Sequence, residues 1–232
     1  MVSSAEGDHG RLVTSGNPRR TVAGMDTITP RHTRVFVDGG WLLLAAAAAL
    51  TRAPSVSRED IRLDPPRMVA ALAGKAQDLT GRPVSRIHWY DGARQDKDPT
   101  PEHRALAATV GVDLTLGALR RHDGVWQQKR VDGLIQRDMT HLARTGQTLD
   151  FVLVSGDEDL AVAAEEVRAL GGTVHALGVT ETGRWAMSPY FASSCNDVHL
   201  LTSGDLAGSL WVRGARLTSL ANSGIARVLA AS

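Results

Sequence analysis

The stretch Phe151-Val-Leu-Val-Ser-Gly-Asp-Glu-Asp159 decides how this chain folds. Its first four residues form a continuous apolar run, which is typical of a strand buried on both faces of a parallel sheet. Gly156 then permits close approach of the backbone, and Asp157 and Asp159 stand before an Ala- and Glu-rich segment of high helix propensity. The stretch predicts a buried strand that carries carboxylates at its carboxyl end and leads into a helix.

A second stretch near the start of the chain, Arg34-Val-Phe-Val-Asp38, has the same pattern. Its apolar, β-branched run ends in an acid, Gly39-Gly40 follows, and the segment from Trp41 to Leu50 is apolar on all sides. A short apolar run followed by a longer apolar segment of good helix formers predicts a buried strand that leads into a buried helix.

The rest of the chain alternates between helical and strand-like patterns. Helices are expected over residues 67–79, 102–110, 131–143 and 160–170, and strands over 84–90, 112–116 and 173–177. Residues 51–66 should form a surface loop, and turns are expected at 91–92 and 122–124. Alternating strands and helices predict an α/β fold with a mainly parallel sheet sandwiched by helices, a three-layer, Rossmann-like arrangement.

Composition indicates one folded domain with tails. The sequence has 232 residues, of which 43% are hydrophobic, and this is enough for a single core. We expect a flexible N-terminal tail over residues 1–32 and the folded domain over 33–203. Residues 204–232 form a C-terminal extension to which the sequence assigns no role, with helical patterns near 204–212 and 225–231.

Charge and cysteine content limit the class of protein. The formal net charge of +1 gives no argument for a globally basic nucleic-acid-binding protein, although local patches remain open. A single cysteine, Cys195, excludes an intrachain disulfide and a Cys-based zinc cluster, which favours the cytoplasm. The N-terminus lacks a signal-peptide pattern, and Asp38 interrupts the apolar run from Val35 to Leu50, so no membrane span is expected.

The acids that follow the two buried strands should meet at one edge of the sheet. Asp38 ends the first strand, and Asp157 and Asp159 follow the second, and parallel strands bring their carboxyl ends to the same edge. Neighbouring carboxylates raise each other's pKa values, and a hard divalent cation with oxygen ligands removes this repulsion. Because no Cys or His stands beside these acids, Mg²⁺ or Mn²⁺ fits better than Zn²⁺.

Each acid also has a purely structural interpretation. Asp132, at the start of the predicted helix over 131–143, could close the pocket or simply stabilise the helix N-terminus. Asp38 before two glycines could belong to a turn, and Ser155 or Asp157 could be an N-cap. Lys129, Arg130 and Arg94 are candidate phosphate contacts near this edge, as is Arg137, but exposed arginines are often merely solvated.

At these residues the chain resembles the NYN family of PIN-like nuclease domains, which occur in bacterial LabA-like and eukaryotic RNA-processing proteins. Coverage runs from about Arg34 to Leu201. The matching motifs, in order, are Val35-Phe-Val-Asp-Gly39, Trp89-Tyr-Asp-Gly92, Lys129-Arg-Val-Asp132 with Asp138, Val152-Leu-Val-Ser-Gly-Asp-Glu-Asp159 and Asn196-Asp-Val198.

The resemblance implies a Mg²⁺-dependent ribonuclease with a PIN-like fold. Asp38, Asp132 and Asp157 would be catalytic and, with Asp159, would hold the metal, while Ser155 joins the basic residues as a candidate substrate contact. Single-stranded RNA is the expected partner, and the family also suggests a homodimer.

Two departures from the family pattern keep a second hypothesis open. Gly40 stands where the family often has Asn, and Arg130 stands where it often has Gly. Loss of the amide could weaken the orientation of a ligand, and Arg130 adds bulk and charge beside the pocket. The alternative is a catalytically weak regulatory module that binds RNA or a protein partner.

Overall fold

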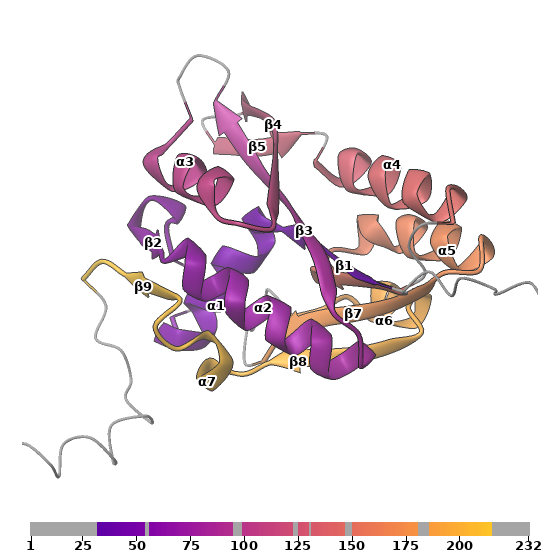
Figure 1. The fold of residues 1–232 in the computed structure, drawn as a ribbon. Helices are drawn as coiled ribbons and strands as arrows, with labels where there is room; N and C mark the ends of the chain where they lie inside the picture. The colour runs from indigo at the N-terminus through magenta and orange to yellow at the C-terminus, as the bar shows by residue number, and fades with distance from the viewer. Residues whose placement is uncertain are drawn as a thin grey trace, which may run out of the picture. The chain divides into compact units, whose positions relative to one another are not determined.

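A computed structural model describes residues 32–53, 56–94, 99–122, 125–129, 131–146, 150–180 and 186–214. Among these residues, seven strands form one sheet in the order β5-β4-β3-β1-β6-β7-β8 (Figure 1). The strands are β1 (Thr33–Asp38), β3 (Val84–Arg94), β4 (Val112–His122), β5 (Val125–Lys129), β6 (Asp150–Val154), β7 (Thr173–Val179) and β8 (Asp197–Leu201). Only β5 is antiparallel to its neighbour, so six strands of this sheet are parallel.

Helices cover both faces of the sheet and complete the three predicted layers (Figure 1). One face carries α1 (Gly39–Thr51), α2 (Pro65–Thr80), α3 (Pro101–Ala108) and α7 (Ser203–Leu206). The other face carries α4 (Val131–Arg144), α5 (Ala161–Ala169) and α6 (Pro189–Ser194). The α/β fold with a mainly parallel, helix-covered sheet is therefore confirmed.

The alternation of side chains along β1 explains why its sequence is apolar throughout. Val35 and Val37 pack into the core under α1 and α2, while Phe36 packs into the core under α4 and α5. The Phe36 ring stacks on Phe151 of the neighbouring β6 with ring centres 5.8 Å apart. A central strand with no solvent-facing side must be apolar at every position.

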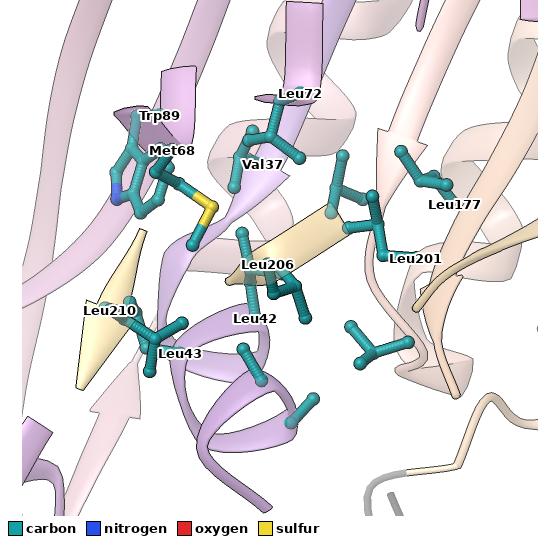
Figure 2. Packing of buried hydrophobic residues seen from close by; sticks show 14 of the residues in the cluster. Val37, Leu42, Leu43, Met68, Leu72, Trp89, Leu177, Leu201, Leu206 and Leu210 are labelled. Carbon is teal, nitrogen blue, oxygen red and sulfur yellow. The ribbon is translucent and has the colours of Figure 1, made fainter. Parts of the chain in front are cut away.

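The core on the α1 face joins parts of the chain that are distant in sequence. Trp89 of β3 is fully buried there, and Leu206 and Leu210 from the C-terminal part of the chain pack into the same cluster. Figure 2 shows these side chains together with Val37, Leu42, Leu43, Met68, Leu72, Leu177 and Leu201.

Two elements near the sheet edge differ from the sequence-based expectation. Asp91 and Gly92 do not form a turn, because β3 continues through them to Arg94 and pairs with β4 along this length. Likewise, β4 runs on to His122 instead of ending at 116, because β5 pairs with its last five residues. Pairing with a neighbouring strand overrides local turn signals.

The segment predicted as a surface loop over 51–66 contains regular structure. A single 3₁₀ turn, Arg58–Asp60, leads into β2 (Ile61–Leu63), which pairs antiparallel with β9 (Leu210–Val212). The helix expected over 204–212 is thus wrong beyond Leu206, because residues 210–212 complete this two-stranded sheet. The helical pattern at 225–231 and the tail over 1–31 lie outside the described residues.

Candidate active site

Asp38, Asp132 and Asp157 converge at the carboxyl end of the central strands. Asp38 is the last residue of β1, Asp132 is the second residue of α4, and Asp157 follows β6 by three residues. One carboxylate oxygen from each lies within 4.8 Å of the others. The structure therefore brings together the three acids that the sequence singled out as catalytic.

Asp38 is the most buried of the three and is the N-cap of α1. Its Oδ1 accepts the backbone N–H of Trp41 at 3.1 Å, and its Oδ2 accepts the Ser155 hydroxyl at 3.4 Å. The pKa of Asp38 is raised to about 7, mainly by burial and in part by the charges of Asp132, Asp157 and Asp91, while the Trp41 N–H lowers it. The folded chain thus holds this carboxylate in a place where its negative charge is costly.

Asp132 reaches the site from the first turn of α4. Burial raises its pKa above the ordinary range, and the negative charges of Asp157 and Asp159 add to this effect. A carboxylate in the first turn of a helix is favoured by the helix dipole, which was the structural alternative for this residue. The upward shift shows that burial and neighbouring acids outweigh that benefit here.

The loop after β6 positions Asp157 through a set of local hydrogen bonds. The Ser155 hydroxyl accepts the N–H of Asp157 at 3.2 Å, and Asp157 Oδ1 accepts the N–H of Asp159 at 3.1 Å. Gly156 is required because a Cβ there would lie 2.5 Å from Cζ2 of Trp41. The predicted N-cap role of Asp157 is therefore real and coexists with its place in the acidic group.

A cavity of about 490 Å³ opens beside the three acids. Trp41 and Leu44 of α1 give it an apolar wall, and Gly40 also lines it. The cavity has the size of a small-ligand pocket, which is typically between about 300 and 1,000 Å³.

The opposite wall of the cavity holds residues that the sequence did not single out as site residues. The Nη2 atom of Arg58 and the Nε2 atom of His103 each lie 3.4 Å from Oδ2 of Asp91. Glu102, 3.9 Å from Arg58, and Arg62 of β2 also line this wall. The only sequence signal was Asp91, one residue beyond the predicted strand, because the 51–66 segment showed no apolar periodicity.

The other predicted site residues are placed less centrally or are not described. Asp159 is exposed and lies outside the group of oxygens within 4.8 Å, although its charge acts on Asp132. Lys129 ends β5 and Arg94 ends β3, but their side chains and the whole of Arg130 lie outside the described residues.

Ser155 has a different position from the one expected for a substrate contact. It is fully buried, and its hydroxyl is engaged by Asp38 and by the backbone of Asp157. A buried hydroxyl with two internal partners orients the acids. Direct contact of Ser155 with substrate stays a prediction.

A protein-family model matches the sequence over the same part of the chain. The NYN domain model matches residues 32–202, which is most of the chain. The chain belongs to the NYN family. The NYN domain is a PIN-like nuclease fold, and the domains of this family are generally nuclease-like and nucleic-acid-binding.

Two further comparisons add little to the NYN assignment. The uncharacterised protein y4oD of Sinorhizobium fredii (strain NBRC 101917 / NGR234) is 38% identical over 88 residues, which cover 38% of this chain and 39% of y4oD. The matched part thus spans about two-fifths of that relative. A solved structure of Phytolacca americana UGT2 gives a TM-score of 0.35 at 12% identity over 65% of this chain and 31% of that one.

No helix among the described residues of this NYN protein is long and apolar enough to cross a membrane.

Proposed function

We propose that this NYN domain is a Mg²⁺- or Mn²⁺-dependent ribonuclease that hydrolyses phosphodiester bonds of single-stranded RNA. The observation that carries the proposal is the convergence of Asp38, Asp132 and Asp157 beside an open cavity, with oxygens within 4.8 Å of one another. Three carboxylates at such distances are stable together only when a cation or protons offset their charge.

The donor set fits a hard divalent cation. All three side chains offer carboxylate oxygens, which Mg²⁺ and Mn²⁺ prefer, and none offers the sulfur or imidazole ligands typical of Zn²⁺. The raised pKa values of Asp38 and Asp132 indicate charge that the protein itself leaves uncompensated. A bound cation would remove this cost and would restore the ordinary acidity of both groups.

Other groups of the chain orient Asp38, complete the metal ligands and contact the phosphate. Ser155 and the Trp41 N–H hold Asp38 in a fixed orientation, and Asp132 and Asp157 complete the ligand set. When bound, the metal would polarise the scissile phosphate and lower the pKa of a coordinated water. Arg62 of β2 lines the cavity and is a candidate contact to the phosphate of a bound strand.

Further residues complete the proposed site. Asp159 is the candidate fourth ligand, and Lys129, Arg130 and Arg94 are candidate contacts to the RNA backbone beyond the cavity. We propose a nuclease domain over residues 33–203 against which the start of the C-terminal extension packs, the cytoplasm as its compartment, and a homodimer as its assembly.

A regulatory module that binds RNA without cutting it is the alternative function. The observation that favours it is the pairing of Arg58 with Asp91 and Glu102, which offsets the positive charge of this arginine in the cavity lining. Gly40 adds to this argument because it supplies no side chain to orient a ligand or a water. Both functions use the same cavity, but only the nuclease needs the acids to bind a metal.

The test measures cleavage of a labelled single-stranded RNA with Mg²⁺, with Mn²⁺ and with EDTA. Asp157→Asn keeps the size of the side chain and one oxygen that accepts hydrogen bonds, but removes the negative charge. Asp78→Asn makes the same change at an exposed position of α2 and is the control. The proposal expects metal-dependent cleavage in the wild type and in Asp78→Asn and none in Asp157→Asn. RNA binding without cleavage, equal in wild type and Asp157→Asn, would support the regulatory module.

A further inference from the structure

A second group of metal-binding side chains lies at the other end of the sheet from the acids. His175 is the third residue of β7, Asp197 is the first residue of β8, and His199 follows two residues later. The acids of the candidate active site follow the carboxyl ends of parallel strands, whereas these residues lie near the amino ends. One ligand atom from each of the three lies within 4.8 Å of the others.

The sheet register explains why these three side chains share one face. Side chains alternate along a strand, so Asp197 and His199 point to the same side of β8. His175 is the direct partner of Asp197 in the parallel β7–β8 pair. Leu177 and Leu201, which continue the same alternation on each strand, both pack into the core on the α1 face, so the cluster lies on that side.

The contacts converge on the carboxylate of Asp197. Nδ1 of His175 lies 2.8 Å from Oδ1 and 3.0 Å from Oδ2, and Nε2 of His199 lies 3.1 Å from Oδ1. Two imidazoles that share one carboxylate oxygen must each present an N–H there, or must share a cation with it. Three N and O atoms on two paired strands thus form a set of possible metal ligands.

His175 holds its ring in a fixed place beside Asp197. The residue is 7% exposed, and its Nδ1 faces the Asp197 carboxylate, whereas its Nε2 is buried on the other side of the ring. Burial of the ring limits its movement and keeps Nδ1 directed at the cluster. Asp197 and His199 are more exposed, which leaves a path from solvent to the cluster and room for water ligands.

We propose that His175, Asp197 and His199 bind one Zn²⁺ ion, independently of the acidic group around Asp38. Two imidazole nitrogens and one carboxylate oxygen are a typical Zn²⁺ ligand set, with water in the fourth position, whereas Mg²⁺ prefers oxygen ligands alone. The site at the carboxyl ends of the strands and the site near their amino ends therefore differ in the class of metal that they select.

Two of the three separations between ligand atoms are close to those of a tetrahedral zinc site, and the third, between the two histidine nitrogens, lies within 4.8 Å. Tetrahedral ligands at about 2.0–2.1 Å from Zn²⁺ lie about 3.3 Å from one another. Oδ1 of Asp197 lies 2.8 Å from Nδ1 of His175 and 3.1 Å from Nε2 of His199, a few tenths of an ångström closer than that. Shorter distances are expected when N–H···O hydrogen bonds take the place of the ion. Asp197 and His199 lie on β8, which pairs only with β7 among the described strands, so this edge has room to move.

Zinc at this position would join the last strand of the sheet to the rest of the domain. The ion would bridge β7 and β8. These strands are also held together by backbone hydrogen bonds and by the burial of Leu201. A ligand that binds only the folded state stabilises it, so Zn²⁺ at about a hundredfold excess over its Kd should raise the Tm by about 5 °C or more.

The test uses the full chain with any purification tag removed and with Asp38→Asn/Asp157→Asn as background, so that zinc cannot bind at the acidic edge. After EDTA treatment, Zn²⁺ is titrated calorimetrically into this background and into the background carrying His199→Gln. His141→Gln, at an exposed position of α4, is the matched control. X-ray absorption at the zinc edge reports whether imidazole nitrogens lie in the first coordination shell.

The proposal expects one Zn²⁺ per chain in the background and in His141→Gln, with imidazole ligands and a higher Tm. It expects binding at least about tenfold weaker in His199→Gln, whose Tm without metal should match that of the background. Asp197→Asn should reproduce the loss. Absence of saturable zinc binding in the background, or zinc binding unchanged by His199→Gln, would overturn the proposal, and neither outcome bears on nuclease activity.

Discussion

The Ser155 hydroxyl lies 3.4 Å from Oδ2 of Asp38 and joins the ends of two neighbouring strands at the acidic edge. The same hydroxyl accepts the N–H of Asp157, so one buried side chain orients two of the three converging acids. Ser155→Ala should therefore weaken Mn²⁺ binding by about tenfold, because groups that orient metal ligands contribute on that scale. Calorimetric titration of Mn²⁺ into wild type and variant measures the effect.

Ser193→Ala is the matched control for this change. Ser193 is exposed, and its hydroxyl donates to the carbonyl of Tyr190 within α6, so metal binding should be unchanged. Ser155→Ala should also cost about 1–3 kcal/mol of folding free energy, because the Asp157 N–H loses its partner. Equal Mn²⁺ affinity in Ser155→Ala and wild type would contradict the positioning role.

Asp38 should make the metal-free protein less stable as the pH rises. Its pKa is about 7 in the folded chain, against an ordinary value of 3.8, so between these values the folded state binds the proton more tightly than the unfolded state. The stability given by the protonated carboxyl is present below about pH 4 and is lost as the pH rises through 7. In EDTA at pH 8, Asp38→Asn should be more stable than wild type by about 2–4 kcal/mol.

Urea unfolding at pH 5 and pH 8 checks this sign. The difference between Asp38→Asn and wild type should be larger at pH 8, and comparison of the two chains cancels the titration of other groups. Saturating Mg²⁺ should raise the stability of the wild type and leave Asp38→Asn nearly unchanged. If the difference in unfolding free energy between wild type and Asp38→Asn were the same at pH 5 and pH 8, the charge of Asp38 would carry no penalty for burial.

Gly156→Ala should disturb the wall of the cavity. The added Cβ would lie 2.5 Å from Cζ2 of Trp41 and 2.9 Å from Cα of Met187, and the Met187 backbone cannot move as cheaply as a flexible side chain. We expect a loss of about 1–3 kcal/mol in the free energy of unfolding. RNA cleavage should fall as well, because Trp41 lines the cavity beside Asp38.

Gly74→Ala provides the matched control for Gly156→Ala. Gly74 lies within α2, and a Cβ there meets no atom within 4 Å, so the substitution should stabilise the chain by about 0.5–1 kcal/mol. Thermal unfolding of both variants separates steric conflict from the general effect of replacing glycine. Similar unfolding temperatures for the two variants would contradict the close packing of Trp41 on Gly156.

The central strands and the acidic edge were predictable because local patterns determine them. The apolar runs that end at Asp38 and Val154 are buried on both faces, and parallel pairing of β1 with β6 brings their ends together. Asp132 was less certain from the sequence, since a carboxylate in the first turn of a helix has a structural use of its own. Its place in the group depends on how α4 packs on the sheet.

The far wall of the cavity could not be predicted for a different physical reason. Ile61 and Leu63 form a strand only because Leu210–Val212 pair with them, and a contact across about 150 residues leaves no local period. Arg58 and Arg62 reach the cavity through this pairing. Asp91 was read as part of a turn because Asp-Gly is a common turn signal, whereas pairing with β4 extends the strand through it.

Leu210→Ala should test whether the C-terminal strand belongs to the folded domain. Leu210 is 2% exposed and packs into the core on the α1 face, so its truncation should cost about 2–5 kcal/mol. Leu170→Ala makes the same change at a residue that is 42% exposed and should cost much less, about 0.5 kcal/mol.

Leu210→Ala should also separate metal binding from RNA binding. Because Asp38, Asp132 and Asp157 come from other elements, Mn²⁺ binding should survive in the folded variant. RNA affinity should fall, because the β2–β9 pair that carries Arg62 loosens. Urea unfolding, Mn²⁺ titration and RNA binding on the same samples distinguish these effects. Equal stability of the two leucine variants would mean that residues 210–212 lie outside the cooperative fold, as the predicted boundary at 203 implies.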